Sequence, residues 1–162
     1  MELKEKILLK LKTHFKDVDF STEEFRGEYC ITIPNKIIVD ACELLKNDEE
    51  LAFNLCEDIT AVDWGRLNNR FTMVYFIFSM KNRFRLKIKC DLGDGVEKID
   101  SVTSVWKSAN WAEREVYDMY GIEFNNHPDL RRMYMPESFE YHPLRKEFPV
   151  MGIPGSLSLP KK

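Results

Sequence analysis

Proline placement constrains this chain more than any other feature of its sequence. Six of the seven prolines lie in the last forty-one residues, never more than eight positions apart: Pro128, Pro136, Pro143, Pro149, Pro154 and Pro160. Proline lacks a backbone N–H and clashes with the preceding helical turn, so this spacing leaves little room for a helix or a central strand. We therefore predict a globular domain of residues 1–121 followed by an extended segment, residues 122–162, which we call the C-terminal arm.

The C-terminal arm is nevertheless rich in large apolar side chains, unlike segments that stay disordered. These side chains are Phe124, Leu130, Met133, Tyr134, Met135, Phe139, Tyr141, Leu144, Phe148, Val150, Met151, Ile153, Leu157 and Leu159. A segment that forms little regular structure has to bury such groups against something else, because their burial is what stabilises folded chains. We expect the globular domain to cover the first part of the arm and partner proteins to cover the rest.

The overall composition is that of one soluble globular domain. The chain has 162 residues, 44% hydrophobic and 31% charged, which fits a single domain of ordinary size. The net charge of −3 gives no general reason to bind nucleic acid or an anionic membrane. The longest apolar run, MVYFIF at residues 73–78, is far shorter than the ~20 residues of a membrane-spanning helix. The first twelve residues lack the pattern of a secretory signal.

The cysteines do not follow a metal-binding pattern. Cys30, Cys42, Cys56 and Cys90 include no CxxC pair, so we expect no iron–sulfur or zinc site built from this chain alone. Without an export signal, we interpret the four residues as reduced thiols in the cytoplasm.

Periodicity in the first half predicts alternating helices and strands. Apolar residues at helical spacing predict a helix over residues 3–15. Residues 28–34 are rich in β-formers and end at proline, which predicts a short or edge strand. Residues 36–58 predict two short helices broken at Asn47–Asp48. Residues 59–65 predict a strand that ends at a glycine.

Two strands joined by a tight turn near Lys81 and Asn82 predict a β-hairpin. The first, residues 70–80, is apolar on both faces, so we expect it to be central and covered on both sides. The second alternates apolar residues with a basic face made of Arg83, Arg85, Lys87 and Lys89. Such a face could bind RNA, but stacking aromatics are missing from it and the net charge is negative. We favour a solvated face, or one paired with acidic helix residues.

Two more helices are expected before the C-terminal arm. Ile99, Val102 and Val105 recur at three-residue intervals and predict a short helix. Residues 111–120 predict another, with Asn110 as its cap and Gly121 at its end. Together the elements predict an α+β fold, with helices packed on a small, mostly antiparallel or mixed sheet of about four strands.

The second of these helices concentrates the ionisable residues of the segment NWAEREVYDMYG. In a helix Glu113 could return a hydrogen bond to Asn110 in a capping box, Trp111, Glu115 and Asp118 would share a face, and Arg114 and Asp118 would form an i,i+4 pair. Acid–base catalysis by the three carboxylates is one interpretation. Arg114 argues against it, because a neighbouring guanidinium favours the charged form of every carboxyl nearby.

A metal site at His127 and His142 is a second interpretation, and arginines close to both histidines oppose it. We favour a third, in which arginine forks pair with carboxylates in a network that fixes a structure or a subunit interface. A stand-alone enzyme and an RNA-binding sheet remain the rivals. The predicted interface and ion-pair residues are Glu113, Arg114, Glu115, Asp118, His127, Asp129, Arg131, Arg132, His142 and Arg145, and no residue of the chain is assigned a catalytic role.

The stretch ANWAEREVYDMYGIEFNNHPDLRRMYM, followed by HPLRKEFP, resembles a known family. It is similar to the thirty-kilodalton subunit of the proton-translocating NADH–quinone oxidoreductase, respiratory complex I. The resemblance covers roughly residues 100–150. Two positions depart from the family pattern, which usually has glycine where this chain has Tyr141 and aspartate where it has Glu147.

The resemblance implies a core subunit of the peripheral arm of that complex, on the cytoplasmic side of the cell inner membrane. It implies a hetero-oligomer in which this chain holds no cofactor, while FMN, iron–sulfur clusters and quinone are bound by partner subunits. The expected partners are the subunit that shapes the quinone pocket and the subunit that holds the terminal cluster, so membrane contact comes only through the complex. Related subunits occur in membrane-bound hydrogenases and in ferredoxin- or F420-dependent complexes, which are the alternative assemblies.

Overall fold

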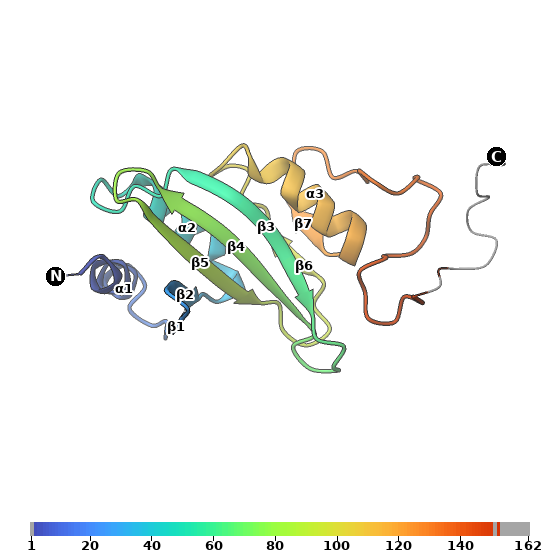
Figure 1. Ribbon diagram of the computed structural model, residues 1–162, viewed down its shortest axis with the longest axis horizontal. Helices are drawn as coiled ribbons and strands as arrows, with labels where there is room; N and C mark the ends of the chain where they lie inside the picture. The colour runs from blue at the N-terminus through green and yellow to red at the C-terminus, as the bar shows by residue number, and fades with distance from the viewer. Residues whose placement is uncertain (1, 151, 153–162) are drawn as a thin grey trace.

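The computed structural model describes residues 2–150 and residue 152 (Figure 1). It is an α+β fold, as predicted, in which helices pack on a five-stranded sheet, and a second, two-stranded sheet includes residues 123–125 of the C-terminal arm. No helix in this part of the chain is both long enough and apolar enough to cross a membrane. The elements are α1 (Leu3–His14), β1 (Ser21–Phe25), β2 (Glu28–Thr32), η1 (Asn35–Ile37), α2 (Ile38–Asn47), β3 (Leu55–Asp63), β4 (Phe71–Ser79), β5 (Phe84–Asp91), β6 (Lys98–Asp100), α3 (Ala109–Tyr120) and β7 (Glu123–Asn125).

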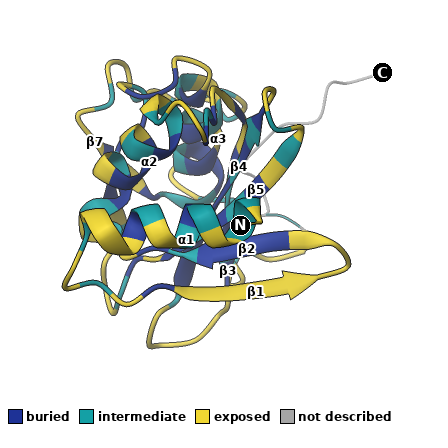
Figure 2. Ribbon diagram, turned by 90° about the vertical axis from the view of Figure 1, so that its left-hand side faces the viewer, coloured by how far each residue is buried: buried dark blue, intermediate teal, exposed yellow. Residues whose placement is uncertain are grey.

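The large sheet is mixed, with strand order β1-β2-β5-β4-β3. The predicted hairpin is present as the antiparallel pair β4–β5, and β3 and β1 also pair antiparallel with their neighbours, whereas β2 runs parallel to β5. The segment predicted as a short or edge strand is short, but it lies between β1 and β5. The edge position belongs to β1, which is exposed along its whole length (Figure 2).

The core lies between one face of this sheet and the helices. On α2, residues Ile38, Ala41, Cys42 and Leu45 have no exposed surface, and their spacing is that of one helix face. They meet the inward side chains of β4, of which Tyr75 and Ile77 are fully buried. Burial of each large aliphatic side chain contributes about 1.5–3 kcal/mol, so this layer is a principal source of stability.

The first hairpin strand, β4, is central, as predicted, because it lies between β5 and β3, but the prediction that it is covered on both sides is wrong. The second face of β4 lines an open groove of about 480 Å³, whose floor includes Val62, Val74 and Phe76. One end of the groove is bounded by Trp64, whose Nε1–H donates to Thr72 Oγ1 over 3.0 Å. One face of β4 is apolar because it packs in the core, and the other is apolar because it lines this groove, which is itself partly apolar.

The basic face of β5 is paired with acids, but these acids come from strands rather than from helices. Lys89 pairs with Glu23 of β1 at 2.7 Å, Lys87 with Glu28 of β2, and Arg85 with Glu57 of β3 at 2.5 Å. All three pairs are at least partly exposed, so each stabilises the fold only weakly. The basic side chains of β5 are thus paired with acidic side chains of the same sheet.

The second helix expected within residues 36–58 does not form. Asp48 Oδ1 accepts the backbone N–H groups of Glu50 and Leu51 (2.9 and 3.1 Å), which closes a turn instead of starting a helix. Ala52 then adopts a positive φ of 47°, and the chain enters β3 at Leu55. The polar residues at the predicted break therefore end helical structure altogether.

The short helix expected over residues 99–105 is also wrong. Ile99 lies in β6, which pairs in parallel with β7. A single turn follows, in which the Val102 carbonyl accepts the N–H groups of Val105 and Trp106 (3.0 and 2.9 Å). The three-residue spacing of apolar groups thus reflects a strand followed by one turn, both packed into the core.

Candidate subunit-interface site

The helix α3 is the element around which the predicted site is organised. It ends, as predicted, at Gly121, whose φ of 73° is the left-handed conformation that favours glycine. Its start differs from the prediction: Asn110 lies inside the first turn, and the carboxyl group of Glu113 bonds Ser101 and Val102 rather than Asn110. The predicted capping box is therefore absent, because Glu113 faces the core.

The last carbonyls of a helix have no partner within the helix and need donors from elsewhere. At the end of α3, Gly121 and the C-terminal arm supply these donors. The bonds are Gly121 N–H to Tyr117 O (2.9 Å), His142 Nδ1–H to Asp118 O (3.0 Å), Leu144 N–H to Met119 O (3.1 Å) and Arg145 Nε–H to Tyr120 O (2.5 Å). The arm thus completes α3, and the positive charge of Arg145 complements the negative end of the helix dipole.

Asp118 holds a second part of the C-terminal arm to α3. Its buried Oδ2 accepts the N–H groups of Met133, Tyr134 and Met135 at 3.0, 2.7 and 3.0 Å, and its Oδ1 accepts Nη1–H of Arg132 at 2.7 Å. Burial alone would raise the pKa of this carboxyl. The three backbone donors and the arginine outweigh burial, so the pKa is held below its usual range and the group is a carboxylate.

Arg114 does not pair with Asp118, contrary to the prediction from their spacing. Its guanidinium lies 4.8 Å from the Trp111 ring centroid and donates to the carbonyls of Arg131 (3.0 Å) and Arg132 (3.2 Å). Trp111, Glu115 and Asp118 lie on one side of α3, as their spacing predicts, but Trp111 and Glu115 are exposed whereas the arm covers Asp118. The arm supplies Asp118 with a better set of donors than its helical neighbour could.

Three residues that anchor the C-terminal arm were not predicted from the sequence. Asp63 at the end of β3 accepts the N–H of Lys146 at 2.9 Å and forms a bidentate pair with Arg70 at 2.9 and 2.8 Å. The Arg70 partner holds the pKa of Asp63 far below its usual range, against the opposing effect of burial. Glu97 accepts Nη2–H of Arg145 at 2.7 Å. The sequence did offer one signal for Asp63, because it is an acidic residue at the end of an apolar strand.

The remaining predicted residues lie at the margin of this cluster or outside it. Asp129 and Arg131 pair only with each other, two positions apart and exposed. Glu115 is exposed on α3. His127 donates from Nε2 to the Asn110 carbonyl at 3.2 Å and accepts the Asp129 N–H at Nδ1 at 3.0 Å, so it orders a turn.

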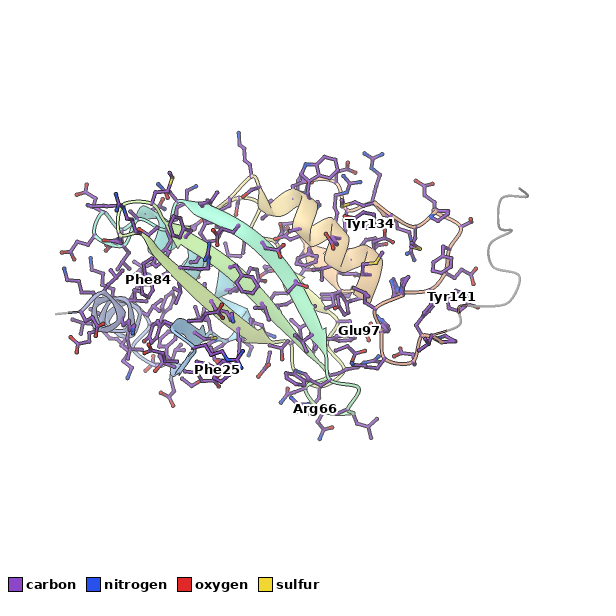
Figure 3. The ribbon with its side chains drawn as sticks, viewed as in Figure 1. Phe25, Arg66, Phe84, Glu97, Tyr134 and Tyr141 are labelled. Carbon is purple, nitrogen blue, oxygen red and sulfur yellow. The ribbon has the colours of Figure 1, made fainter. Side chains whose placement is uncertain are left out.

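Between and among its anchors the arm carries apolar and aromatic groups, several of which are exposed. Phe139, Tyr141 and Phe148 form a cluster with ring centroids 5.6–6.3 Å apart, beside an open groove of about 440 Å³ lined by Tyr141, His142, Arg145 and Phe148. Tyr134 and Tyr141, 60% and 46% exposed, lie on the part of the arm remote from the sheet (Figure 3). The predicted apolar residues Met151, Ile153, Leu157 and Leu159 lie outside the described residues.

The part of the chain that the structure describes contains no cluster of histidine, cysteine and acidic side chains arranged to hold a metal ion. All four cysteines are free and buried. Burial raises the pKa of the Cys56 and Cys90 thiols to about 12, which keeps them protonated and unreactive at neutral pH.

Residues 31–153 match the family model described as the respiratory-chain NADH dehydrogenase 30 kDa subunit. The chain belongs to this family. Members of this family are subunits of an oxidoreductase complex, so the chain is a subunit of a multi-subunit NADH–quinone oxidoreductase.

Curated relatives are similar over most of their length. The NADH-quinone oxidoreductase subunit designated C in Geobacter sulfurreducens is 47% identical over 90% of this chain and 89% of its own. The NADH-quinone oxidoreductase subunit designated C 2 in Rhizobium meliloti is 46% identical over 82% of this chain and 72% of its own. These proteins extend the similarity well beyond residues 100–150, where the sequence motifs lie.

Two solved structures are similar in fold. A trypsin-resistant fragment of Nqo5 is 25% identical, with a TM-score of 0.64 over 79% of this chain and 100% of the fragment. A chain of the membrane-bound sulfane sulfur reductase, an archaeal respiratory membrane complex, has a TM-score of 0.75 over 93% of this chain and 88% of its own, at 21% identity. The second likeness concerns the fold alone.

Proposed function

We propose that this chain is a cofactor-free subunit of the peripheral arm of an NADH–quinone oxidoreductase. In this role it braces the quinone-reducing module and supports its assembly, and it performs no chemistry itself. Its partners would be the subunit that shapes the quinone pocket and the subunit that holds the terminal cluster, on the cytoplasmic side of the inner membrane. Membrane contact would come only through these partners.

The observation that carries the proposal is the contrast within the C-terminal arm. Its backbone is fixed at the end of α3 by Asp118, Arg132 and Arg145, so the position of the arm is determined by the globular domain. Tyr134, Tyr141 and Leu144 nevertheless remain exposed. A fixed backbone that presents aromatic groups to solvent is typical of a preorganised protein interface, which supports the assignment of residues 122–162 as a partner-binding arm.

The alternative is the equivalent subunit of a membrane-bound hydrogenase or of a ferredoxin- or F420-dependent complex. The archaeal reductase chain supports this alternative by its fold only. The relatives that are 45–47% identical favour the NADH–quinone oxidoreductase. Affinity purification of the tagged chain from membranes distinguishes the two, because the subunits that accompany it differ between these complexes.

An Arg114→Ala strain tests the bracing role. Loss of the two bonds from Arg114 to the arm carbonyls should lower the amount of assembled complex in membranes, whereas turnover per assembled complex stays near the wild-type value. Arg66→Ala is the matched control, because Arg66 lies exposed in the β3–β4 loop and bonds only the nearby Asn69 carbonyl. Normal assembly with lost turnover would instead indicate a direct chemical role for Arg114.

A further inference from the structure

Glu113 is a fully buried carboxyl group that the anchoring of the C-terminal arm does not use. Its side chain has no exposed surface, and no lysine or arginine among the described residues pairs with it. It accepts Ser101 Oγ–H at 2.6 Å and the Val102 N–H at 2.8 Å. An ionised carboxylate that is buried without a cation is unfavourable, so this environment favours the protonated acid.

One titratable neighbour is His127, whose Nε2 lies 3.9 Å from Glu113 Oε2. Nδ1 of this imidazole accepts the Asp129 N–H, so Nε2 carries the proton and donates to the Asn110 carbonyl. A second proton on Nδ1 would break the bond to Asp129. Burial, followed by the nearby Arg114, lowers the pKa of His127. The imidazole is therefore neutral at pH 7 and does not compensate a charge on Glu113.

The other groups around Glu113 are also uncharged at neutral pH. Cys42 of α2, Cys56 of β3 and Tyr75 of β4 face it from the core, and burial raises the pKa of each. Arg114 is turned toward the carbonyls of the arm, and Asp129 pairs with Arg131. Nothing packed against Glu113 from any of these elements supplies a fixed positive charge.

A pair of hydroxyl groups connects this carboxyl with the surface. Ser101 Oγ lies 2.6 Å from Glu113 Oε2 and 2.7 Å from Thr103 Oγ1, and Thr103 is half-buried. A hydroxyl both donates and accepts, so the chain can run in either direction. With Glu113 ionised, Ser101 donates to the carboxylate and accepts from Thr103. With Glu113 protonated, the acid donates to Ser101, which donates to Thr103.

We propose that Glu113 is a proton-binding site built into the core, connected to solvent through Ser101 and Thr103, and that its proton occupancy sets how firmly α3 is held to the turn at residues 101–103. Both protonation states keep every hydrogen bond of the chain, so the site exchanges its proton without local unfolding. Since α3 also carries the arm, the same proton affects the element that positions residues 132–145.

The direction of the pH dependence follows from the folded and unfolded chains. Burial raises the pKa of Glu113 from 4.5 to about 7, against the opposing bonds from Ser101 and Val102. The folded chain therefore binds one more proton than the unfolded chain between about pH 4.5 and 7. The stabilising contribution of the protonated acid is complete below pH 4.5 and is lost as pH rises toward 7, because the ionised form is a buried charge between α3 and the turn.

The test is a titration of the full-length chain, selectively labelled with carboxyl ¹³C in its glutamates, with Glu113→Gln used to assign the Glu113 signal. In the wild type one glutamate should titrate with a midpoint near pH 7. Denaturant unfolding should show a loss of stability between pH 5 and 7 that Glu113→Gln lacks, since the amide replaces the protonated acid. Glu115→Gln, on the exposed side of the same helix, should retain that loss. A midpoint for Glu113 below pH 5, or equal pH dependence in wild type and Glu113→Gln, would overturn the proposal.

Two relay variants keep the test decisive if Glu113→Gln does not fold. Ser101→Ala removes the charge-assisted donor of the ionised form and should raise the Glu113 midpoint by about half a unit to one unit, the equivalent of one hydrogen bond. Thr103→Val removes a partner of Ser101 in both protonation states, so it should shift the midpoint by less than Ser101→Ala does. An unchanged midpoint in Ser101→Ala, or a larger shift in Thr103→Val, would refute the relay.

Discussion

Replacement of Asp118 by alanine is the most direct test of how the C-terminal arm is held. The buried carboxylate accepts four hydrogen bonds, from Arg132 and from three consecutive backbone N–H groups. Breaking a buried ion pair by removing one partner costs about 3–5 kcal/mol, because the other partner is left without its counter-charge. For a chain of this size each kcal/mol corresponds to about 2–4 °C, so Asp118→Ala should lower the melting temperature by roughly 6–20 °C.

The assay combines calorimetry of the full-length chain at pH 7 with hydrogen exchange. The amides of residues 133–135 should lose protection from exchange in Asp118→Ala. In Asp118→Asn their protection should be intermediate between Asp118→Ala and the wild type, because asparagine keeps an acceptor without the charge. Glu115→Ala, a carboxyl removed from the exposed side of the same helix, should change stability by less than about 0.5 kcal/mol. If Asp118→Ala and Glu115→Ala melt alike, or if exchange at residues 133–135 is unchanged, the carboxylate does not anchor the arm.

Two further predictions concern the same junction. Gly121→Ala should destabilise the chain by about 1–3 kcal/mol or more in chemical denaturation. The residue has φ +73°, and a Cβ would lie 2.5 Å from His142 Nε2 and 2.6 Å from Arg145 Nη2. Gly27→Ala is the control, because Gly27 has a positive φ but open space around it, and equal losses of stability in the two variants would show that the contacts with the arm do not matter. Asp63→Asn should remove part of the acid sensitivity of folding: the folded pKa of Asp63 is depressed, so its contribution is present above the unfolded pKa and is lost as pH falls. Urea unfolding at pH 3 and pH 7 measures this, and an unchanged difference between the two pH values in the variant would contradict it.

The sequence predicts the local elements well where hydrophobic period and turn chemistry agree. The β4–β5 hairpin and the end of α3 at Gly121 are examples, because each depends on residues close together in the chain. The helices expected within residues 48–58 and 99–105 failed for one reason. In both segments apolar groups occur at helical intervals, but the Asp48 turn and the β6–β7 pairing provide different partners for the backbone. Hydrophobic periodicity indicates which side chains are buried, but it does not determine which hydrogen bonds the backbone forms.

The structure brings some of the predicted ion-pair residues together and separates others. Asp118, Arg132, His142 and Arg145 do converge at the end of α3, whereas Glu113 turns into the core. Asp63 was missed because its partner Lys146 lies 83 positions away in the chain. Spacing on a helix shows which pairs can meet, but it does not show that a distant segment will supply stronger donors, as it does for Asp118. Whether this cluster faces a partner protein stays a prediction.

The completion of α3 by the C-terminal arm has a consequence for biosynthesis. The carbonyls of Asp118, Met119 and Tyr120 receive their donors from residues 142–145, which leave the ribosome more than twenty residues later. Until then the final turn of the helix is capped by water and frays. In a nascent chain shorter than 145 residues the end of α3 therefore lacks part of its hydrogen bonding. Translation order thus delays the maturation of this end of α3 until residues 142–145 have been made and have folded back onto it.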